Sequence, residues 1–221
     1  MINNYQDYFK EHYNCNFSIQ DTNLQMNFLY SQLQYSLGLV NKPLTNQKVL
    51  EVGSGMGALA KLILQHDVSK YIGLELDKDI VDFCNQNISN NFINLSLTEY
   101  ILSGKEKFDL IFAFEVLEHF ENPLEEITNI YNLLNDKGIF IGTSPYPFKK
   151  NVLADETHLY VLHPLNWKRL FEMSGFSEVK IYPMTSLPYI WRINKKFNII
   201  FPFYFPVKHF ISTTLIVANR D

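Results

Sequence analysis

The sequence has few cysteines and no cluster of basic residues. Only Cys15 and Cys84 occur among 221 residues, and they stand too far apart to show the paired spacing of a disulfide framework or a zinc site. Lys and Arg number 19 against 23 for Asp and Glu, so the net charge is −4. Because no basic run could neutralise a line of phosphates, we expect no nucleic-acid partner.

Long apolar runs are also missing. The first residues are too polar for the apolar core of a signal peptide. Residues 197–207 form the most apolar stretch, but Pro202 and Pro206 interrupt it, and it is shorter than the ~20 residues that span a bilayer. We therefore expect a cytoplasmic protein. Hydrophobic residues still make up 47% of the chain, which suffices for a full core and predicts a single domain over residues 1–221.

The pattern of apolar residues changes near Lys48. Residues 1–47 have helical spacing and predict a helical N-terminal cap that ends between Gly38 and the turn at residues 41–43. From Lys48 onward, short apolar runs alternate with helical periods, which is typical of βαβ units around a parallel sheet. The predicted core covers residues 48–182 and 212–221, with strands at residues 48–52, 71–76, 93–97, 108–114, 138–144, 177–182 and 212–219.

A glycine-rich turn follows the first predicted strand. The chain reads EVGSGMG from Glu51 to Gly57 and then enters a predicted helix. Glycines at alternate positions allow a sharp turn and a close approach of ligand to the main chain. The amides at the start of the next helix face the same place, at the carboxyl end of a parallel strand. The turn therefore predicts a nucleotide-like ligand.

The turn alone leaves several interpretations open. Gly53, Gly55 and Ala58 also fit the dinucleotide pattern, and Glu75 lies at the distance expected for an acid that binds ribose, as it would in an NAD site. Two details favour S-adenosylmethionine (SAM): Glu51 could hold an ammonium group, and Gly57 would admit a ligand without a pyrophosphate. In the simplest alternatives the glycines only make a tight turn and Glu75 is merely solvated.

Five segments between Lys48 and Gly175 carry a family resemblance. They read VLEVGSGMGALA, IGLELD, FDLIFAFEVLEHFENP, LLNDKGIFIGTSP and HPLNWKRLFEMSGF, in that order. Together they resemble the class I SAM-dependent methyltransferases, especially the branch that includes ubiquinone-type O-methyltransferases. The resemblance implies an α/β fold with a Rossmann-like, seven-stranded sheet that is mostly parallel, has an antiparallel last strand and carries helices on both faces. It also implies SAM as the cofactor, because no such ordered set is expected of dehydrogenases.

The resemblance assigns cofactor-binding roles to individual positions. It places the methionine end of SAM at the glycine turn, the ribose at Glu75 and the methyl group beside residues 115–119. The region after the third predicted strand departs from the family pattern, and Thr98 and Glu99 are the best adenine candidates there. The complete set of expected cofactor contacts is Glu51, Gly53, Ser54, Gly55, Gly57, Glu75, Leu76, Thr98, Glu99 and Glu115.

Methyl transfer to a hydroxyl requires positioning and removal of a proton. His119 is the predicted base, since an imidazole with a pKa near 6.5 suits proton abstraction at neutral pH; alternatively it only packs or caps local backbone. Glu118 could orient that ring or join it in a divalent-metal site, as some quinone-type relatives look metal-assisted, but no compact ligand cluster supports a metal and we predict none. His158 is a further catalytic candidate, whereas His163, which precedes Pro164, is expected to cap a helix.

An aromatic segment, residues 183–211, separates the last two predicted strands. It is too long for a simple connection and predicts a lid over a hydrophobic acceptor, unless its aromatic side chains merely pack on the sheet. Arg192, Lys195, Lys196 and Lys208 flank its apolar part, so residues 197–207 could also touch an anionic membrane surface or an acidic substrate.

The motifs together predict SAM-dependent methylation of a small molecule at oxygen. Methylation at nitrogen or carbon in lipid, quinone, glycan or secondary metabolism stays open. So does a catalytically silent SAM-fold binding protein, which need not bind SAM at micromolar strength. The sequence gives no oligomeric state.

Overall fold

The computed structural model describes residues 18–221 apart from 105, 149, 188–189, 195–196 and 206–209. Cys15, the first 17 residues of the predicted cap, Lys195, Lys196, Pro206 and Lys208 therefore lie outside the described residues. The described strands are β1 (Lys48–Val52), β2 (Lys70–Leu74), β3 (Phe92–Ile93), β4 (Phe108–Phe114), β5 (Leu134–Pro145), β6 (Glu178–Ser186), β7 (Ile200–Phe201) and β8 (Ile211–Asn219).

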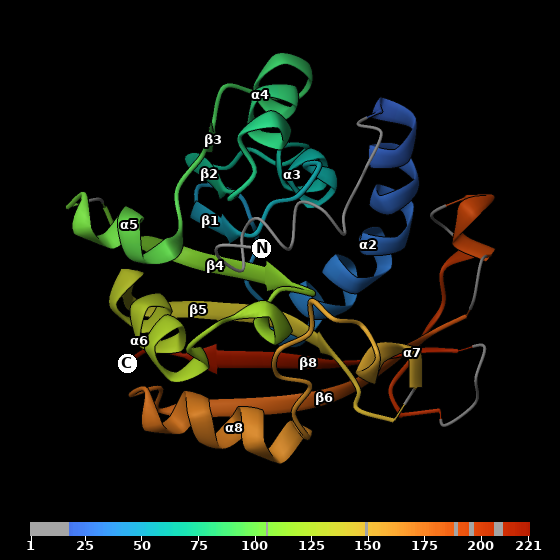
Figure 1. Cartoon of the computed structure of the whole chain (residues 1–221). Helices are drawn as coiled ribbons and strands as arrows, with labels where there is room; N and C mark the ends of the chain where they lie inside the picture. Colours follow the sequence, from blue (N-terminus) through green and yellow to red (C-terminus); the bar gives the residue numbers. More distant parts are fainter. Residues whose placement is uncertain (1–17, 105, 149, 188–189, 195–196, 206–209) are drawn as a thin grey trace, which may run out of the picture.

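These strands form one sheet in the order β3-β2-β1-β4-β5-β8-β6-β7 (Figure 1). Strands β1 to β5 are parallel, whereas β8 lies between β5 and β6 and is antiparallel to both. The predicted α/β fold with an antiparallel last strand is confirmed. The described sheet has eight strands rather than seven, because the two-residue strand β7 adds to β6 from within the aromatic segment.

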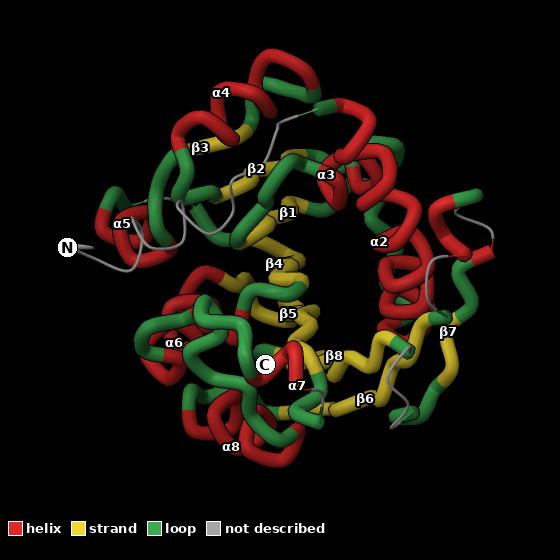
Figure 2. The backbone as a smooth tube through the Cα atoms, turned by 45° about the vertical axis from the view of Figure 1, so that its right-hand side comes forward, coloured by secondary structure: helices red, strands yellow, loops and turns green. Residues whose placement is uncertain are grey.

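Helices cover both faces of the sheet (Figure 2). One face packs against α2 (Ile19–Val40), α3 (Ala58–Ile63) and α4 (Lys78–Asn87), around a buried cluster that includes Leu33, Leu59 and Cys84. The other face packs against α5 (Leu97–Leu102), α6 (Pro123–Leu133) and α8 (Pro164–Met173), around Tyr100, Ile130 and Trp167. Short helices α7 (Lys150–Leu153), η1 (Leu117–His119) and η2 (Ile190–Arg192) lie in loops.

Local sequence signals set several helix ends. The Asp77 carboxylate accepts hydrogen bonds from the amides of Asp79 and Ile80 at the start of α4, and Pro123 and Pro164 open α6 and α8. Helix α2 continues past Gly38 to Val40. There Asn41 adopts a left-handed conformation, φ 47°, and ends the helix.

The third predicted strand is wrong beyond Ile93. The Ser96 hydroxyl accepts a hydrogen bond from the Glu99 amide, while the Glu99 carboxylate accepts one from the Ser96 amide. This capping box starts helix α5, so Thr98 and Glu99 lie in a helix and not at a strand end.

Strand β6 runs four residues into the segment that we expected to be an insertion. It pairs with β8 without interruption from Glu178 to Ser186. Pro183 is tolerated because on its other side β7 pairs only with Thr185 and Ser186, so the missing amide breaks no ladder bond there. Among the described residues, no helix combines the length and apolar character needed to cross a membrane.

Candidate active site

The carboxyl ends of β1, β2, β4 and β5 meet at one edge of the sheet. We call residues 51–57 and 75–77 the glycine half of this edge, and residues 115–119, 143–146 and 152–158 the histidine half. The two halves touch, since a Cβ added to Gly53 would lie 2.6 Å from Cγ2 of Val116. A ligand that spans both halves would therefore follow the ends of neighbouring strands.

The three glycines of the turn have different surroundings. Their φ values are +66° at Gly53, +48° at Gly55 and +72° at Gly57, a region that favours glycine. A Cβ at Gly53 or Gly57 would collide with the side chains of Val116 or Ile88, whereas a Cβ at Gly55 would have no described atom within 4 Å. Of the three, only Gly55 therefore has open space beside its Cα, where a ligand could approach the main chain.

Glu75 ties the glycine turn to the end of β2. One carboxylate oxygen accepts a hydrogen bond from the Gly55 amide at 2.9 Å, and the other accepts from the Leu76 and Asp77 amides at 2.7 and 3.0 Å. Burial raises its pKa, and these amide bonds partly counter the rise. Glu75 is thus not merely solvated, and its fixed carboxylate still has lone pairs for other donors.

Glu51 is buried against Tyr71. The Tyr71 hydroxyl donates to a Glu51 carboxyl oxygen at 2.5 Å. Burial raises the pKa of Glu51 to about 8, although the bond from Tyr71 lowers it in part. The protonated form is therefore favoured without a ligand, and an ammonium group nearby would favour the ionised form.

Thr98 and Glu99 have local structural partners. Glu99 is occupied by the capping box of α5. The Thr98 hydroxyl accepts from the Asn129 amide at 3.1 Å and donates to Glu126 at 3.4 Å, which joins α5 to α6. Their expected contact with adenine stays a prediction.

Two carboxyl groups are buried in the histidine half. Glu115 has a left-handed φ of +55°, and its amide donates to the Thr143 hydroxyl at 2.9 Å. Burial raises the pKa of Glu115 to about 7, while hydrogen bonds from Thr143 and Thr213 lower it in part. Burial, followed by repulsion from Glu115, raises the pKa of Glu118 far above its ordinary value. This shift favours the protonated form of Glu118.

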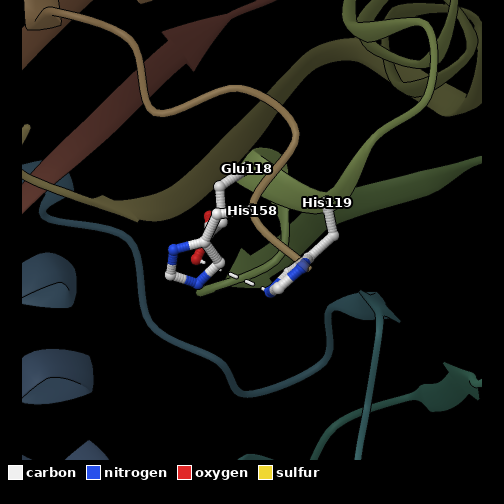
Figure 3. Close-up of side chains that lie close together, drawn as sticks. All are labelled: Glu118, His119 and His158. Carbon is white, nitrogen blue, oxygen red and sulfur yellow. Dashed lines mark ion pairs between the residues drawn. The ribbon is translucent and has the colours of Figure 1, made fainter. Parts of the chain in front are cut away.

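His119 and His158 lie against each other beside Glu118 (Figure 3), with ring centroids 5.0 Å apart. Nδ1 of His119 is 2.8 Å from the Thr157 carbonyl oxygen, and Nδ1 of His158 is 2.8 Å from that of Val152. A carbonyl only accepts hydrogen bonds, so each Nδ1 carries the proton. In the neutral rings Nε2 is then the basic nitrogen. Burial lowers the pKa of His119, which favours the neutral ring.

The same three side chains could hold a metal ion. Ligand atoms of Glu118, His119 and His158 all lie within 4.8 Å of one another. Two imidazoles and a carboxylate suit a divalent cation such as zinc, and Nδ1–H bonded to a carbonyl is a usual arrangement for ligating histidines. The compact cluster that the sequence does not reveal is thus formed by the fold. His163, in contrast, accepts from the Leu165 amide at 3.3 Å, which confirms its predicted capping role.

Sequence reasoning missed several residues that hold the site. The Asn94 amide donates to the carbonyl oxygens of Glu75 and Leu76, and so fixes the loop after β2. Its only signal in the sequence is that it is the first polar residue after a short apolar run. Tyr71, Thr143 and Thr157 carry no such signal, because their partners are distant in the chain.

Comparisons with known proteins agree with this geometry. A family model described as a methyltransferase domain matches residues 33–181. The mitochondrial ubiquinone biosynthesis O-methyltransferase of Dictyostelium discoideum is 29% identical over 130 residues, which cover 52% of this chain and 40% of that protein. The ubiquinone biosynthesis O-methyltransferase of Glaesserella parasuis is 31% identical over 132 residues, which cover 55% of this chain and 56% of that protein. The chain thus spans about half the length of these curated relatives.

A solved structure shares the fold. A SAM-dependent methyltransferase from Archaeoglobus fulgidus superposes with a TM-score of 0.68 at 19% identity, over 98% of this chain and 100% of that chain. The strand order and the glycine turn at the carboxyl edge define the SAM-binding α/β class. The chain belongs to the methyltransferase-domain family, with SAM as its cofactor. The alternative of an NAD site is therefore wrong.

The glycine half fits this cofactor on its own geometry. Gly55 faces open space, and the buried Ser54 hydroxyl has no hydrogen-bond partner among the described residues. Leu76, directly after the fixed Glu75, leaves 40% of its surface exposed at the strand end. These residues offer a close approach, a polar contact and an apolar contact in one place.

Proposed function

We propose that the chain transfers the methyl group of SAM to an oxygen atom of a small-molecule acceptor. The observation that carries this proposal is the His119 ring, which has Nδ1 fixed on the Thr157 carbonyl and Nε2 on the side of Glu118. A hydroxyl acceptor has to lose a proton during transfer, and this ring is placed to take it. The names of the relatives, ubiquinone biosynthesis O-methyltransferases, support oxygen as the acceptor atom.

In this proposal the glycine half binds the cofactor. Glu51, Ser54 and the glycines hold the methionine end, Glu75 takes the ribose hydroxyls, and Leu76 packs on the adenine. Thr98 and Glu99 remain candidates for the adenine edge. Glu115 closes the site on the methyl side, where its buried Oε1 has no hydrogen-bond partner among the described residues.

The histidine half orients the acceptor and moves its proton. SAM supplies a methyl group on its own leaving group, so no enzyme nucleophile is required. As the bond from oxygen to the methyl carbon forms, Nε2 of His119 accepts the hydroxyl proton. Glu118, 1% exposed, lies 3.9 Å from Nε2 of His119 and bounds the site beside this ring, and His158 contacts the acceptor.

A divalent cation on Glu118, His119 and His158 is a second way to handle the same proton. The donor set fits, and such a cation would lower the pKa of a bound hydroxyl. Elemental analysis of the purified protein, together with turnover before and after chelation, distinguishes a bound cation from His119 acting alone as the base. Stoichiometric metal and loss of turnover on chelation would favour the cation, and unchanged turnover in chelator would favour the base.

The aromatic segment supports a hydrophobic acceptor. Tyr204 stacks on Tyr146 with centroids 3.9 Å apart, and its hydroxyl lies 3.3 Å from that of Thr214. Thr214 pairs in register with Ser144, which belongs to the histidine half. The segment is therefore joined to the site, as a wall of the acceptor pocket would be. We expect Tyr204→Leu to raise the KM for the acceptor and to leave SAM affinity unchanged.

We further propose that the segment touches membranes from the cytoplasmic side. Phe197, Ile199 and Phe203 are 50%, 52% and 43% exposed, and Arg192 lies in the same segment. Exposed apolar side chains beside cations suit an anionic lipid surface. Flotation with vesicles containing phosphatidylglycerol should recover the wild-type chain but not Phe197→Ser/Ile199→Ser. Equal recovery of both would contradict this contact.

Product analysis with labelled cofactor tests the proposed reaction. The protein is incubated with methyl-¹³C SAM and separate phenol, catechol, carboxylate and amine acceptors, and the labelled product is identified by NMR. We expect S-adenosylhomocysteine and a label on oxygen. A label on nitrogen or carbon would contradict the choice of atom. SAM binding without turnover on any acceptor would favour a silent binding protein.

A further inference from the structure

The two halves of the histidine pair come from different loops. His119 follows β4, whereas His158 lies between β5 and α8. Two hydrogen bonds join the loops: Nδ1 of His119 donates to the Thr157 carbonyl at 2.8 Å, and the Tyr160 amide donates to the Glu118 carbonyl at 3.0 Å. Both bonds position the rings only if the backbone at residues 155–158 is itself held.

Asp155 holds that backbone. Its Oδ1 accepts hydrogen bonds from the Thr157 amide at 3.0 Å and from the Thr157 hydroxyl at 2.6 Å. Its carbonyl accepts a hydrogen bond from the His158 amide at 3.1 Å, which closes the turn. Thr157 is 1% exposed, so its orientation within the fold is tightly constrained. A single carboxylate thus fixes the peptide whose carbonyl accepts the hydrogen bond from Nδ1 of His119.

The same carboxylate also faces the second ring. Oδ2 of Asp155 lies 3.8 Å from Nε2 of His158, while Nδ1 of His158 donates to the Val152 carbonyl. Asp155 therefore holds the residue that supports the His119 ring and lies close to the His158 ring.

We propose that Asp155 is a positioning residue that holds the Thr157 carbonyl against Nδ1 of His119 and so keeps the His119 ring in the Nδ1–H form. Residues of this kind, one step behind the reacting groups, commonly change activity by about 10- to 100-fold when replaced. The expected effect on turnover rests on the proposed function, whereas the effect on the imidazole rings does not.

The test compares Asp155→Ala with Asp155→Asn. Asparagine keeps an Oδ1 acceptor for Thr157 and loses the charge, and alanine loses both. The side-chain ¹⁵N shifts of His119 and His158 report which ring nitrogen carries the proton. In Asp155→Ala we expect a mixture of the two ring forms at His119 and a fall in kcat of about tenfold or more, with unchanged SAM affinity. Asp155→Asn should retain wild-type shifts and most of the turnover.

Glu172→Ala is the control, because it removes an exposed carboxylate from helix α8, outside both halves of the edge. It should leave the ¹⁵N shifts and kcat unchanged. If Asp155→Ala does not fold, Thr157→Val removes one of the two bonds to Asp155 and should give a smaller change of the same kind at His119. Wild-type shifts at His119 in Asp155→Ala, or in Thr157→Val in its place, would overturn the inference. Equal changes of the ¹⁵N shifts and of kcat in Asp155→Asn would also overturn it, since the charge of Asp155 and not its acceptor oxygen would then position the ring. Absence of turnover in the wild type would refute the proposed function and leave the NMR test intact.

Discussion

The glycine half of the carboxyl edge is held by main-chain groups, whereas the histidine half is held by side chains that meet from distant loops. In the glycine half, three amides donate to Glu75 and the turn uses left-handed glycines. In the histidine half, the His119 ring donates to the Thr157 carbonyl and the Glu115 amide to the Thr143 hydroxyl, both in other segments, while the His158 ring donates to Val152 of its own loop. The first arrangement suits a cofactor that is always the same, and the second can change with the acceptor.

This contrast predicts separable defects. Changes in the glycine half should weaken SAM binding, and changes in the histidine half should lower turnover with SAM binding nearly intact. A variant in one half that shows the defect expected of the other half would contradict this contrast.

The largest effect is expected at Gly55. Gly55→Val puts a branched side chain into the space assigned to SAM and should remove SAM binding in calorimetry. Its left-handed backbone also costs a non-glycine residue about 1–2 kcal/mol. Gly104→Val is the matched control, because Gly104 shares a positive φ and open surroundings but lies outside the site. Normal SAM binding by Gly55→Val would contradict the placement of the cofactor.

A large effect on turnover is expected at His119. His119→Ala should lower kcat by about 10²-fold or more, because it removes the group that accepts the proton in the transition state. The SAM dissociation constant should stay near the wild-type value. His66→Ala, an exposed histidine far from the edge, should leave both unchanged. Loss of SAM binding in His119→Ala would instead assign this ring to the cofactor or to the fold.

An intermediate effect is expected at Glu75. Glu75→Ala should weaken SAM by about 1.5 to 3 kcal/mol, through the loss of a charged hydrogen bond to ribose. The same change frees three amides of the turn, whereas Glu75→Gln keeps one of the two acceptor oxygens and should therefore have a smaller effect. Calorimetry in which Glu75→Ala binds SAM like the wild type would show that this carboxylate serves only the turn.

An effect on stability, with little expected change in turnover chemistry, is predicted from the protonation of Glu51. The folded chain binds a proton up to about pH 8, whereas an unfolded chain releases it near 4.5. The free energy of unfolding should therefore fall as pH rises through this window. Glu51→Gln lacks that loss, so its melting temperature relative to the wild type should rise from about pH 5 to about pH 8. SAM affinity should fall in the same variant. Parallel pH profiles would contradict the buried, protonated state.

Much of the glycine half could be predicted because it is local in sequence. The turn and its flanking strand and helix are contiguous, and Glu75 ends the next strand. The separate roles of the glycines could not be predicted, since Val116 and Ile88 reach them from distant segments. The third strand was wrong for a local reason: the capping box of Ser96 and Glu99 outweighs the apolar pattern.

The histidine half was predicted as a set of residues but not as an arrangement. The motif around Glu118 and His119 drew attention to both, and the loop after β5 to His158. His119 and Thr157 are 38 positions apart, and nothing in the sequence specifies how the second loop folds back. The cluster of potential metal ligands and the turn made by Asp155 depend on that path. Strand β7 escaped prediction because two residues are too few to show a period.

A crystal structure of the chain with S-adenosylhomocysteine tests the division between the two halves most directly. We predict that the homocysteine lies over Gly55 and Ser54, that both ribose hydroxyls donate to the Glu75 carboxylate, and that the sulfur faces residues 115–119. A ribose away from Glu75, or a sulfur that faces away from His119, would contradict the account.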